Sequence, residues 1–85
     1  MISHKMFNKF VAMVDRYYLC DYSDDNRVGG EYFAIDHEAH THVYISRWSK
    51  GYIYFMYTNN DRRFTKIVKT YREYNELTKL IKTFI

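Results

Sequence analysis

The side chains best suited to chemistry lie together in the segment 36–42, DHEAHTH. It holds three imidazoles, at His37, His40 and His42, with two carboxylates beside them. Zinc needs three or four nitrogen, sulfur or oxygen ligands that converge on a tetrahedron, and histidine titrates near neutral pH. The spacing matches no zinc signature, and the only thiol of the chain lies outside the segment. We therefore expect exposed turn residues here, with metal binding, histidine catalysis and a pH-sensitive partner contact as the alternatives.

Three further patterns are weaker as chemical sites. Cys20 has no local group that would activate a thiolate, and its place near a helix C-terminus disfavours one. The acidic residues of the segment 21–25 lack the regular ligand spacing and the closing glutamate of a calcium loop. Gly29-Gly30 has neither the lysine motif nor the strand-to-helix context of a phosphate-binding loop. The sequence thus predicts a protein that is not an enzyme and holds no metal and no cofactor.

Length and composition predict a single globular domain over residues 1–85. Hydrophobic residues make up 47% of the chain and charged residues 27%, without the low-complexity tracts typical of disorder. A single cysteine excludes an internal disulfide framework, and no apolar run reaches the roughly 18 residues of a membrane-spanning helix. We expect a cytoplasmic protein with no membrane contact. Aromatic residues reach 20%, which favours either a core of large rings or a binding surface.

The two halves of the chain carry opposite charge. Residues 1–40 hold four basic and seven acidic side chains, a net charge of −3, and residues 41–85 hold nine basic and three acidic ones, a net charge of +6. Such an asymmetry indicates either a polyanion or acidic partner surface near the C-terminal half, or an ordinary solvated surface.

The spacing of apolar residues predicts the elements that would position these side chains. Apolar residues recur every three or four positions from Ser3 to about Leu19, which predicts an amphipathic helix capped by Ser3. Thr70 and Glu73 match a capping box, and helical spacing of apolar residues follows as far as Phe84. Between the helices, period-two alternation predicts strands, and clustered Asp, Asn, Ser and Gly predict a loop. The expected segments are a helix at 3–19, a loop at 20–30, strands at 31–37, 41–48, 52–58 and 64–69, and a helix at 70–84.

These elements predict an α+β domain, in which an antiparallel β-meander of three to four strands is flanked by an N-terminal and a C-terminal helix. Both helices should pack on one face of the sheet. Alternation in the central hairpin, 41–58, places Val43, Ile45, Ile53 and Phe55 on one face. Because the opposite face is also partly apolar, we expect it to be covered by helices, by a dimer mate or by another partner. That opposite face should carry His42, Tyr44, Ser46, Trp48, Tyr52, Tyr54 and Met56.

Basic residues are interleaved with rings in the second half of the chain. Cations neutralise phosphates and rings stack on unpaired bases, so this pattern favours nucleic-acid binding. The segment from Arg47 to Phe84, with GYIYFMYTNNDRRF followed by a strand and YREYNELTKLI, resembles the sheet-plus-helix DNA-binding domains of phage integrases. The resemblance implies direct nucleic-acid binding and leaves the N-terminal helix outside it. The basic residues concerned are Arg47, Lys50, Arg62, Arg63, Lys66 and Lys69.

A second resemblance is one of type. A compact, proline-free, tyrosine-rich chain of this size without an enzyme site is similar to the small inhibitors encoded by phages and mobile elements, of the anti-CRISPR kind. The resemblance carries over no residue, and it implies an inhibitor that occludes a host nuclease or its nucleic-acid complex. Many such inhibitors are acidic, and the net charge of +3 departs from that. The residues that could form a phosphate-mimicking patch are Asp21, Asp24, Asp25, Asp36 and Glu38.

We therefore expect a non-catalytic binding protein, acting in the cytoplasm of the host cell, that inhibits a nucleic-acid-handling complex by covering its surface. A nucleic-acid-binding module with a basic, aromatic sheet face is the alternative, and a homodimer remains open. The expected contact residues are Trp48, Tyr52, Tyr54, Arg47, Lys50, Arg62, Arg63, Asp24 and Asp25.

Overall fold

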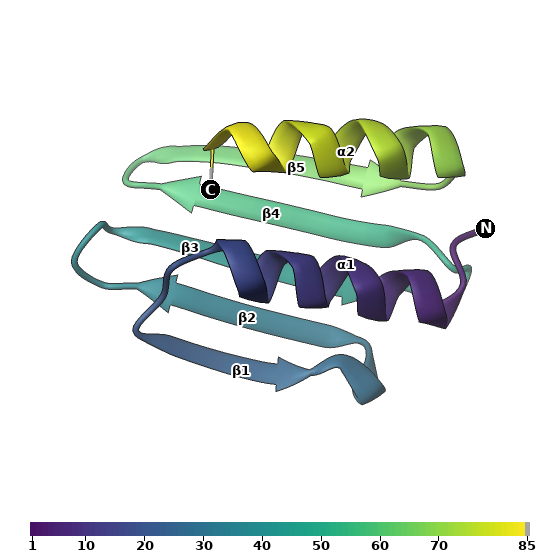
Figure 1. The fold of residues 1–85 in the computed structure, drawn as a ribbon, viewed down its shortest axis with the longest axis horizontal. Helices are drawn as coiled ribbons and strands as arrows, with labels where there is room; N and C mark the ends of the chain where they lie inside the picture. Colours follow the sequence, from purple (N-terminus) through teal and green to yellow (C-terminus); the bar gives the residue numbers. More distant parts are fainter. Residues whose placement is uncertain (85) are drawn as a thin grey trace.

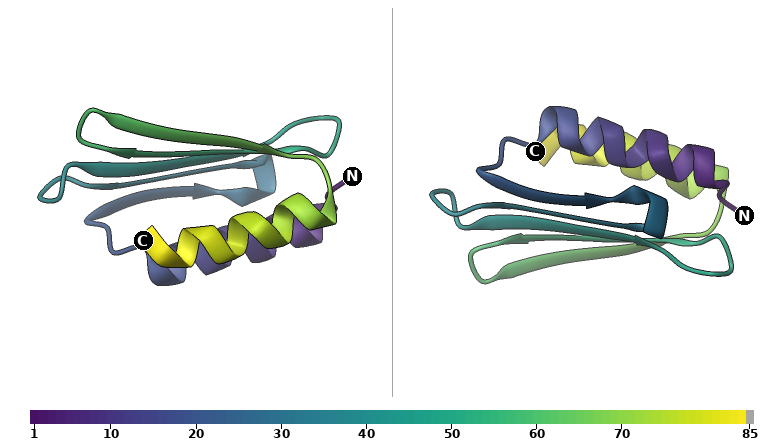
Figure 2. Two further views of the ribbon diagram at one scale, coloured as in Figure 1. Left: turned by 90° about the horizontal axis from the view of Figure 1, so that it is seen from above. Right: turned by 90° about the horizontal axis from the view of Figure 1, so that it is seen from below.

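Two helices lie side by side on one face of a five-stranded antiparallel sheet (Figures 1 and 2). The computed structural model describes residues 1–84, the side chain of Phe84 excepted, so the expected packing of that ring lies outside the described residues. The strands follow one another in the order of the sequence, β1-β2-β3-β4-β5, each paired with the next. The elements are α1 (His4–Tyr17), β1 (Tyr22–Asn26), a short 3-10 helix (Arg27–Gly29), β2 (Glu31–Asp36), β3 (Thr41–Arg47), β4 (Ile53–Asn59), β5 (Arg62–Val68) and α2 (Tyr71–Phe84).

The α+β class, the meander and the two terminal helices are confirmed, and the strand number is higher than predicted. The expected loop at 20–30 contains β1, which pairs with β2 from Tyr22 opposite Ile35 to Asn26 opposite Glu31. All five residues of β1 are exposed, so the strand shows no hydrophobic alternation that a sequence could reveal. The strand forms because its backbone pairs with the backbone of β2 through antiparallel hydrogen bonds. A polar edge strand of this kind also discourages association through the sheet edge.

The first helix begins where its cap predicts. The Ser3 hydroxyl oxygen accepts a hydrogen bond from the Met6 backbone N–H at 3.1 Å. The helix ends at Tyr17, two residues before the expected end, and Tyr17, expected on the apolar stripe, is 50% exposed. Tyr18 instead turns inward and shares a hydrogen bond of 2.6 Å with the Thr41 hydroxyl. The buried stripe of α1 consists of Phe7, Phe10, Val11 and Val14.

The second helix begins with a modified capping box. Thr70 accepts a hydrogen bond from the Glu73 backbone N–H at 3.2 Å, as expected. The Glu73 carboxylate also accepts from the Lys69 backbone N–H at 3.1 Å and from the Thr70 hydroxyl at 3.2 Å. On this helix Leu77 and Ile81 are buried, whereas Leu80, expected on the same stripe, is 43% exposed.

The core lies between the helices and the sheet face that they cover. The alternation expected in the strands is confirmed: Tyr32 and Ala34 of β2, Val43 and Ile45 of β3, and Ile53 and Phe55 of β4 are all buried. The Phe10 ring of α1 meets the Phe55 ring edge-on, with the ring centroids 5.9 Å apart. Because both helices lie on this side, no helix or strand within residues 1–84 covers the opposite face of the sheet (Figure 2).

Candidate interaction surface on the open sheet face

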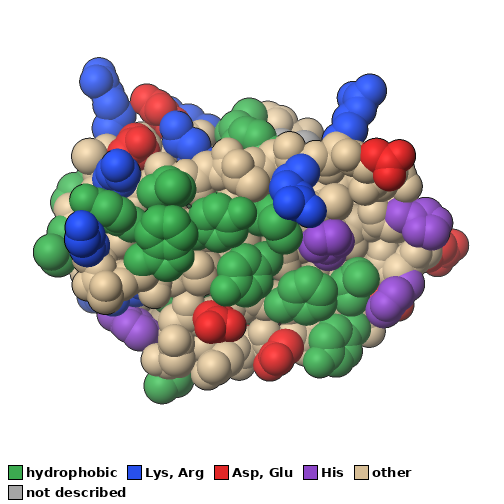
Figure 3. All heavy atoms as spheres, turned by 180° about the vertical axis from the view of Figure 1, so that it is seen from behind, with side chains coloured by type: hydrophobic (Ala, Val, Ile, Leu, Met, Phe, Trp, Pro, Cys, Tyr) green, Lys and Arg blue, Asp and Glu red, His purple; other side chains and the backbone are tan. Residues whose placement is uncertain are grey.

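The side of the sheet away from the helices, here called the open face, presents a band of hydrophobic side chains (Figure 3). Successive side chains of a strand point to opposite faces, so strand register determines which residues share the open face. The middle row runs from Asp24 through Phe33, Tyr44 and Met56 to Thr65, one residue from each strand. The other residues on this face are Tyr22, Asn26, Glu31, Ile35, His42, Ser46, Trp48, Tyr52, Tyr54, Thr58, Arg63, Ile67 and Lys69.

Rings on neighbouring strands cover one another across this face. The Tyr44 and Tyr54 ring centroids are 6.2 Å apart, and the Phe33 and His42 centroids are 6.1 Å apart. Trp48 stacks on Tyr54 with centroids 5.7 Å apart and ring planes within 8° of parallel. Cross-strand aromatic pairs stabilise a sheet, and here they hold the rings in one arrangement. The open face is therefore an ordered aromatic layer.

Trp48 is fixed by polar contacts as well as by stacking. Its indole Nε1–H donates to the Ser46 hydroxyl at 3.0 Å, and its backbone N–H donates to the Tyr52 carbonyl oxygen at 2.9 Å. The turn closes through Gly51, whose φ of +79° is in the left-handed region that favours glycine. Although it is held in this way, Trp48 remains 43% exposed. A rigid, exposed tryptophan is a typical anchor of a protein interface.

A groove of about 420 Å³ lies at the Trp48 end of the open face. Its apolar walls are Trp48, Tyr52 and Ile67, and the Lys69 ammonium lies 5.3 Å from the centre of the Tyr52 ring. Lys50 lines the groove from the turn, and no acidic residue lines it. The groove can therefore hold an apolar group next to a negative charge.

The charges of the open face lie on opposite sides of its aromatic centre. Asp24 on β1 and Glu31 on β2 form an acidic edge. Arg63 and Lys69, at the two ends of β5, form a basic edge. Between these edges, the open-face positions on β3 and β4 carry no Asp, Glu, Lys or Arg side chain, and Lys50 lies in the turn at one end. The centre is thus poor in charge, and the rim is charged with a different sign on each side.

Of the nine expected contact residues, the structure brings six together on or beside the open face. Trp48, Tyr52 and Tyr54 form its aromatic end, Lys50 lies in the adjoining turn, and Asp24 and Arg63 lie on the two edges. The other three lie on the helix side of the sheet or at its end: Arg47, Asp25 and Arg62.

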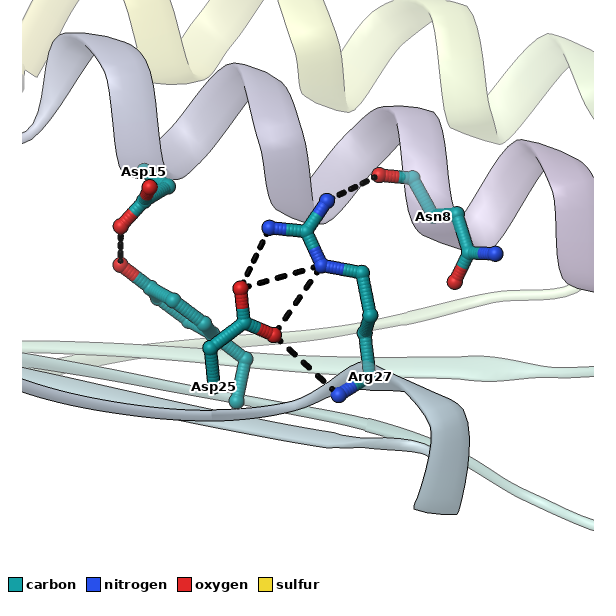
Figure 4. Close-up of polar contacts among 5 residues, drawn as sticks. Asn8, Asp15, Asp25 and Arg27 are labelled. Atoms are coloured by element: carbon teal, nitrogen blue, oxygen red, sulfur yellow. Dashed lines mark hydrogen bonds and ion pairs between the residues drawn. The ribbon is translucent and has the colours of Figure 1, made fainter.

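Arg47 and Asp25 have structural partners on the helix side. Arg47 Nη2 donates to the Ile2 carbonyl oxygen at 3.1 Å and so helps to hold the N-terminal residues. Asp25 forms an ion pair with the Arg27 guanidinium, which also donates to the Asn8 carbonyl oxygen of α1 at 3.5 Å (Figure 4). The hydrogen bonds from Arg27 lower the pKa of the Asp25 carboxyl. Alternation along the strand puts Arg47 and Trp48 on different faces of the sheet. Asp25 and Asp24 also lie on different faces, but the sequence did not predict this because it did not reveal β1; the pairing of β1 with β2 places Asp25 on the helix side.

Alternation predicted Tyr44 and Met56 on this face, but neither these two residues nor Phe33 were among the expected contact residues. Their alternation was visible, but the register that aligns them across three strands was not, because pairing between strands is not a local property. Tyr22 and Ile67 extend the face at β1 and β5 and are 54% and 38% exposed. The strand that carries Tyr22 had no sequence signal at all.

The histidine segment lies at the far end of the sheet from the groove. His37 Nδ1 and Asp21 Oδ2 lie within hydrogen-bond distance at 2.9 Å, and the hydrogen bonds with His37 lower the pKa of the Asp21 carboxyl. His40 forms the turn with a φ of +57°. A shallow depression of about 430 Å³ is lined by His37, His40, His42, Asp36 and Asp61 among others. Within residues 1–84 no three His, Cys, Asp or Glu side chains are arranged to hold a metal ion.

Cys20 is half-buried, and burial is the main cause that raises the pKa of its thiol, with Asp15 and Asp21 adding to the effect. A raised pKa disfavours the reactive thiolate.

In the described part of the chain, no helix has both the length and the apolar character that a membrane crossing requires. Comparison of the chain with protein families, with curated proteins and with solved structures finds no match.

Proposed function

We propose that this chain is a non-catalytic binding protein that docks on a partner protein through its open face. The observation that carries the proposal is a continuous, charge-poor aromatic layer, centred on Tyr44, Tyr54 and Trp48, that no helix or strand among the described residues covers. Interface centres are depleted of charge and enriched in tyrosine, tryptophan and methionine, with a polar rim around them. The open face has this composition, and its charged residues lie at its edges.

The rigidity of the face supports the same function. The rings are held by stacking and by cross-strand contacts, and the sheet is backed by two helices, so little side-chain or backbone freedom remains to be lost on binding. A flat, preorganised face can cover a surface of a larger protein. This favours inhibition by occlusion over chemistry.

The partner that we propose is a host nucleic-acid-handling complex, inhibited because the open face covers part of its surface. The resemblance in size and layout to small phage-encoded inhibitors supports this choice of partner. The groove adds an observation from the structure: Lys50 and Lys69 beside Trp48 suit a partner segment that carries negative charge next to an apolar group.

The second candidate function is direct binding of single-stranded nucleic acid at the groove. Lysines there would contact phosphates, and exposed parts of Trp48 and Tyr52 would stack on bases. Two features favour protein binding instead. One side of the Trp48 ring is already occupied by Tyr54, and the acidic edge at Asp24 and Glu31 repels a phosphate backbone that extends across the sheet.

An affinity capture from a host lysate, with and without nuclease treatment, tests this function. The wild-type chain should retain the same protein under both conditions. Tyr44→Ala and Trp48→Ala should lose it, because truncating an interface anchor costs about 2 kcal/mol or more of binding energy. The matched control is Tyr71→Ala, since Tyr71 is an exposed tyrosine on α2, on the helix side of the protein.

Three results would contradict the proposal or change it. Equal capture by the open-face variants and the wild-type chain would exclude the open face as the docking surface. Capture that disappears after nuclease treatment, together with binding to an oligonucleotide that weakens steeply with salt, would favour the nucleic-acid function. No captured protein under either condition would overturn the inhibitor function.

A further inference from the structure

The charges on the open face are arranged so that the face is complementary to itself. The acidic edge is formed by Asp24 and Glu31, on β1 and β2, and the basic edge by Arg63 and Lys69, at β5. The strand order β1-β2-β3-β4-β5 puts β3 in the middle, between these two edges. A face with opposite charges at its two sides can bind a copy of itself if the second copy is turned to exchange the sides.

In a face-to-face dimer the twofold axis lies in the plane of the interface, and it can run either across the strands or along them. If the axis runs across the strands, β1 of one copy lies over β1 of the other, so acidic edge meets acidic edge and basic edge meets basic edge. If the axis runs along β3, β1 of each copy lies over β5 of the other, so each acidic edge meets a basic edge. Like charges across an interface repel, and opposite charges fix its register. The charges of the two edges therefore favour the axis along β3.

We propose that the free protein forms a twofold-symmetric dimer through the open face, with β1 of each copy over β5 of its partner. The inference rests on the proposed function to the extent that the open face is an interface; it adds that the chain is its own partner when no other is bound. Residues of β3 lie next to the axis, so Tyr44 of one copy meets Tyr44 of the other. Two such sheets would pack face to face with their strands aligned to within about 30°.

The size of the face fits this arrangement. The principal-axis extents are 35 × 24 Å in the view of Figure 1, which looks onto the sheet, so a rectangle that encloses the molecule in this view measures about 840 Å². Specific protein interfaces bury about 800 Å² on each partner. The dimer would thus use nearly the whole open face, and it would hide the surface that binds another partner until that partner displaces the second copy.

Sedimentation velocity over a range of protein concentrations tests the dimer. The wild-type chain should change from monomer to dimer in the micromolar range. Tyr44→Glu should abolish the dimer, because it places two carboxylates next to the axis. Tyr71→Glu is the matched control: it introduces the same charge at an exposed tyrosine on the helix side and should leave the dimer unchanged.

A charge-exchange experiment tests the orientation. One variant, Asp24→Lys with Glu31→Lys, has two basic edges, and the other, Arg63→Glu with Lys69→Glu, has two acidic edges. Each alone should dimerise at least about tenfold more weakly than wild type, because edges of like charge then face each other. Mixed in equal amounts, they should form a heterodimer, since each edge then meets its opposite. All four positions are exposed, so circular dichroism should show the wild-type fold in both variants.

The outcomes separate the dimer from the proposed function. A wild-type chain that stays monomeric at every concentration overturns the dimer, and it leaves the proposed function standing if Tyr44→Ala still loses the captured protein. A dimer that survives Tyr44→Glu, or two variants that fail to associate when mixed, overturns the arrangement proposed here. A dimer with the expected variants but no captured protein supports the inference and overturns the inhibitor function.

Discussion

Tyr32 of β2 links the sheet to α1, and replacing it with phenylalanine tests how the covered face is held. The Tyr32 ring is fully buried, and its hydroxyl donates a hydrogen bond to the Asp15 carboxylate of α1 at 2.7 Å. Tyr32→Phe keeps the ring in the core and removes only this hydrogen bond. The change therefore isolates one polar contact between the two layers.

The expected loss follows from the environment of the two groups. Hydrogen bonds to a charged partner contribute about 1.5–3 kcal/mol to stability. Asp15 is exposed, so water can replace the hydroxyl at its carboxylate, and the loss should fall near the lower limit, at about 1–2 kcal/mol. For a domain of this size that corresponds to a melting temperature lower by roughly 4–16 °C.

Urea unfolding followed by circular dichroism measures this loss. A double-mutant cycle with Asp15→Ala should give a coupling energy of about 1 kcal/mol, because the cycle cancels the effect of each change alone. Tyr44→Phe is the matched control: it removes a hydroxyl from the open face and should change stability by less than about 0.5 kcal/mol. A coupling energy of zero, or equal losses for Tyr32→Phe and Tyr44→Phe, would refute the assignment of this contact as a link between the layers.

Three further predictions concern stability. Burial raises the pKa of four tyrosines above the usual 10.0: Tyr18, Tyr32, Tyr57 and Tyr74. As the pH rises past 10, the unfolded state releases these protons before the folded state does, so the free energy of unfolding should fall. Denaturant titrations at a series of alkaline pH values would measure this fall. Gly51→Ala should lower the free energy of unfolding, measured in urea, by about 1–2 kcal/mol, because φ is +79° at this position and the added methyl group would meet Met1 and Ile2. A free energy of unfolding equal to that of wild type would contradict this. Thr70→Ala should lower the free energy of unfolding by about 1 kcal/mol, because the cap of α2 is lost. Thr70→Ser keeps a hydroxyl at this position and should retain most of the stability of wild type in the same urea titration.

Local patterns predicted much of the layered fold. The 3.6-residue period places one apolar stripe on each terminal helix, and the two-residue period divides the hairpin 41–58 into two faces. Both signals come from residues close together in the chain, so they do not depend on which elements meet. The same signals overextended α1 by two residues, where Tyr18 leaves the helix to reach Thr41 in β3. A contact across 23 residues outweighs the local helical pattern there.

The candidate surface depends mainly on pairing that no local pattern encodes. The sequence alone determined that a second aromatic face exists and that Trp48, Tyr52 and Tyr54 belong to it. The tertiary structure decided that β1 exists, that Phe33, Tyr44 and Met56 align across three strands, and that opposite charges lie at the two edges of this face. The physical reason is that alternation assigns a side chain to a face, whereas its neighbours on that face are set by hydrogen-bonded register between strands that are distant in the chain.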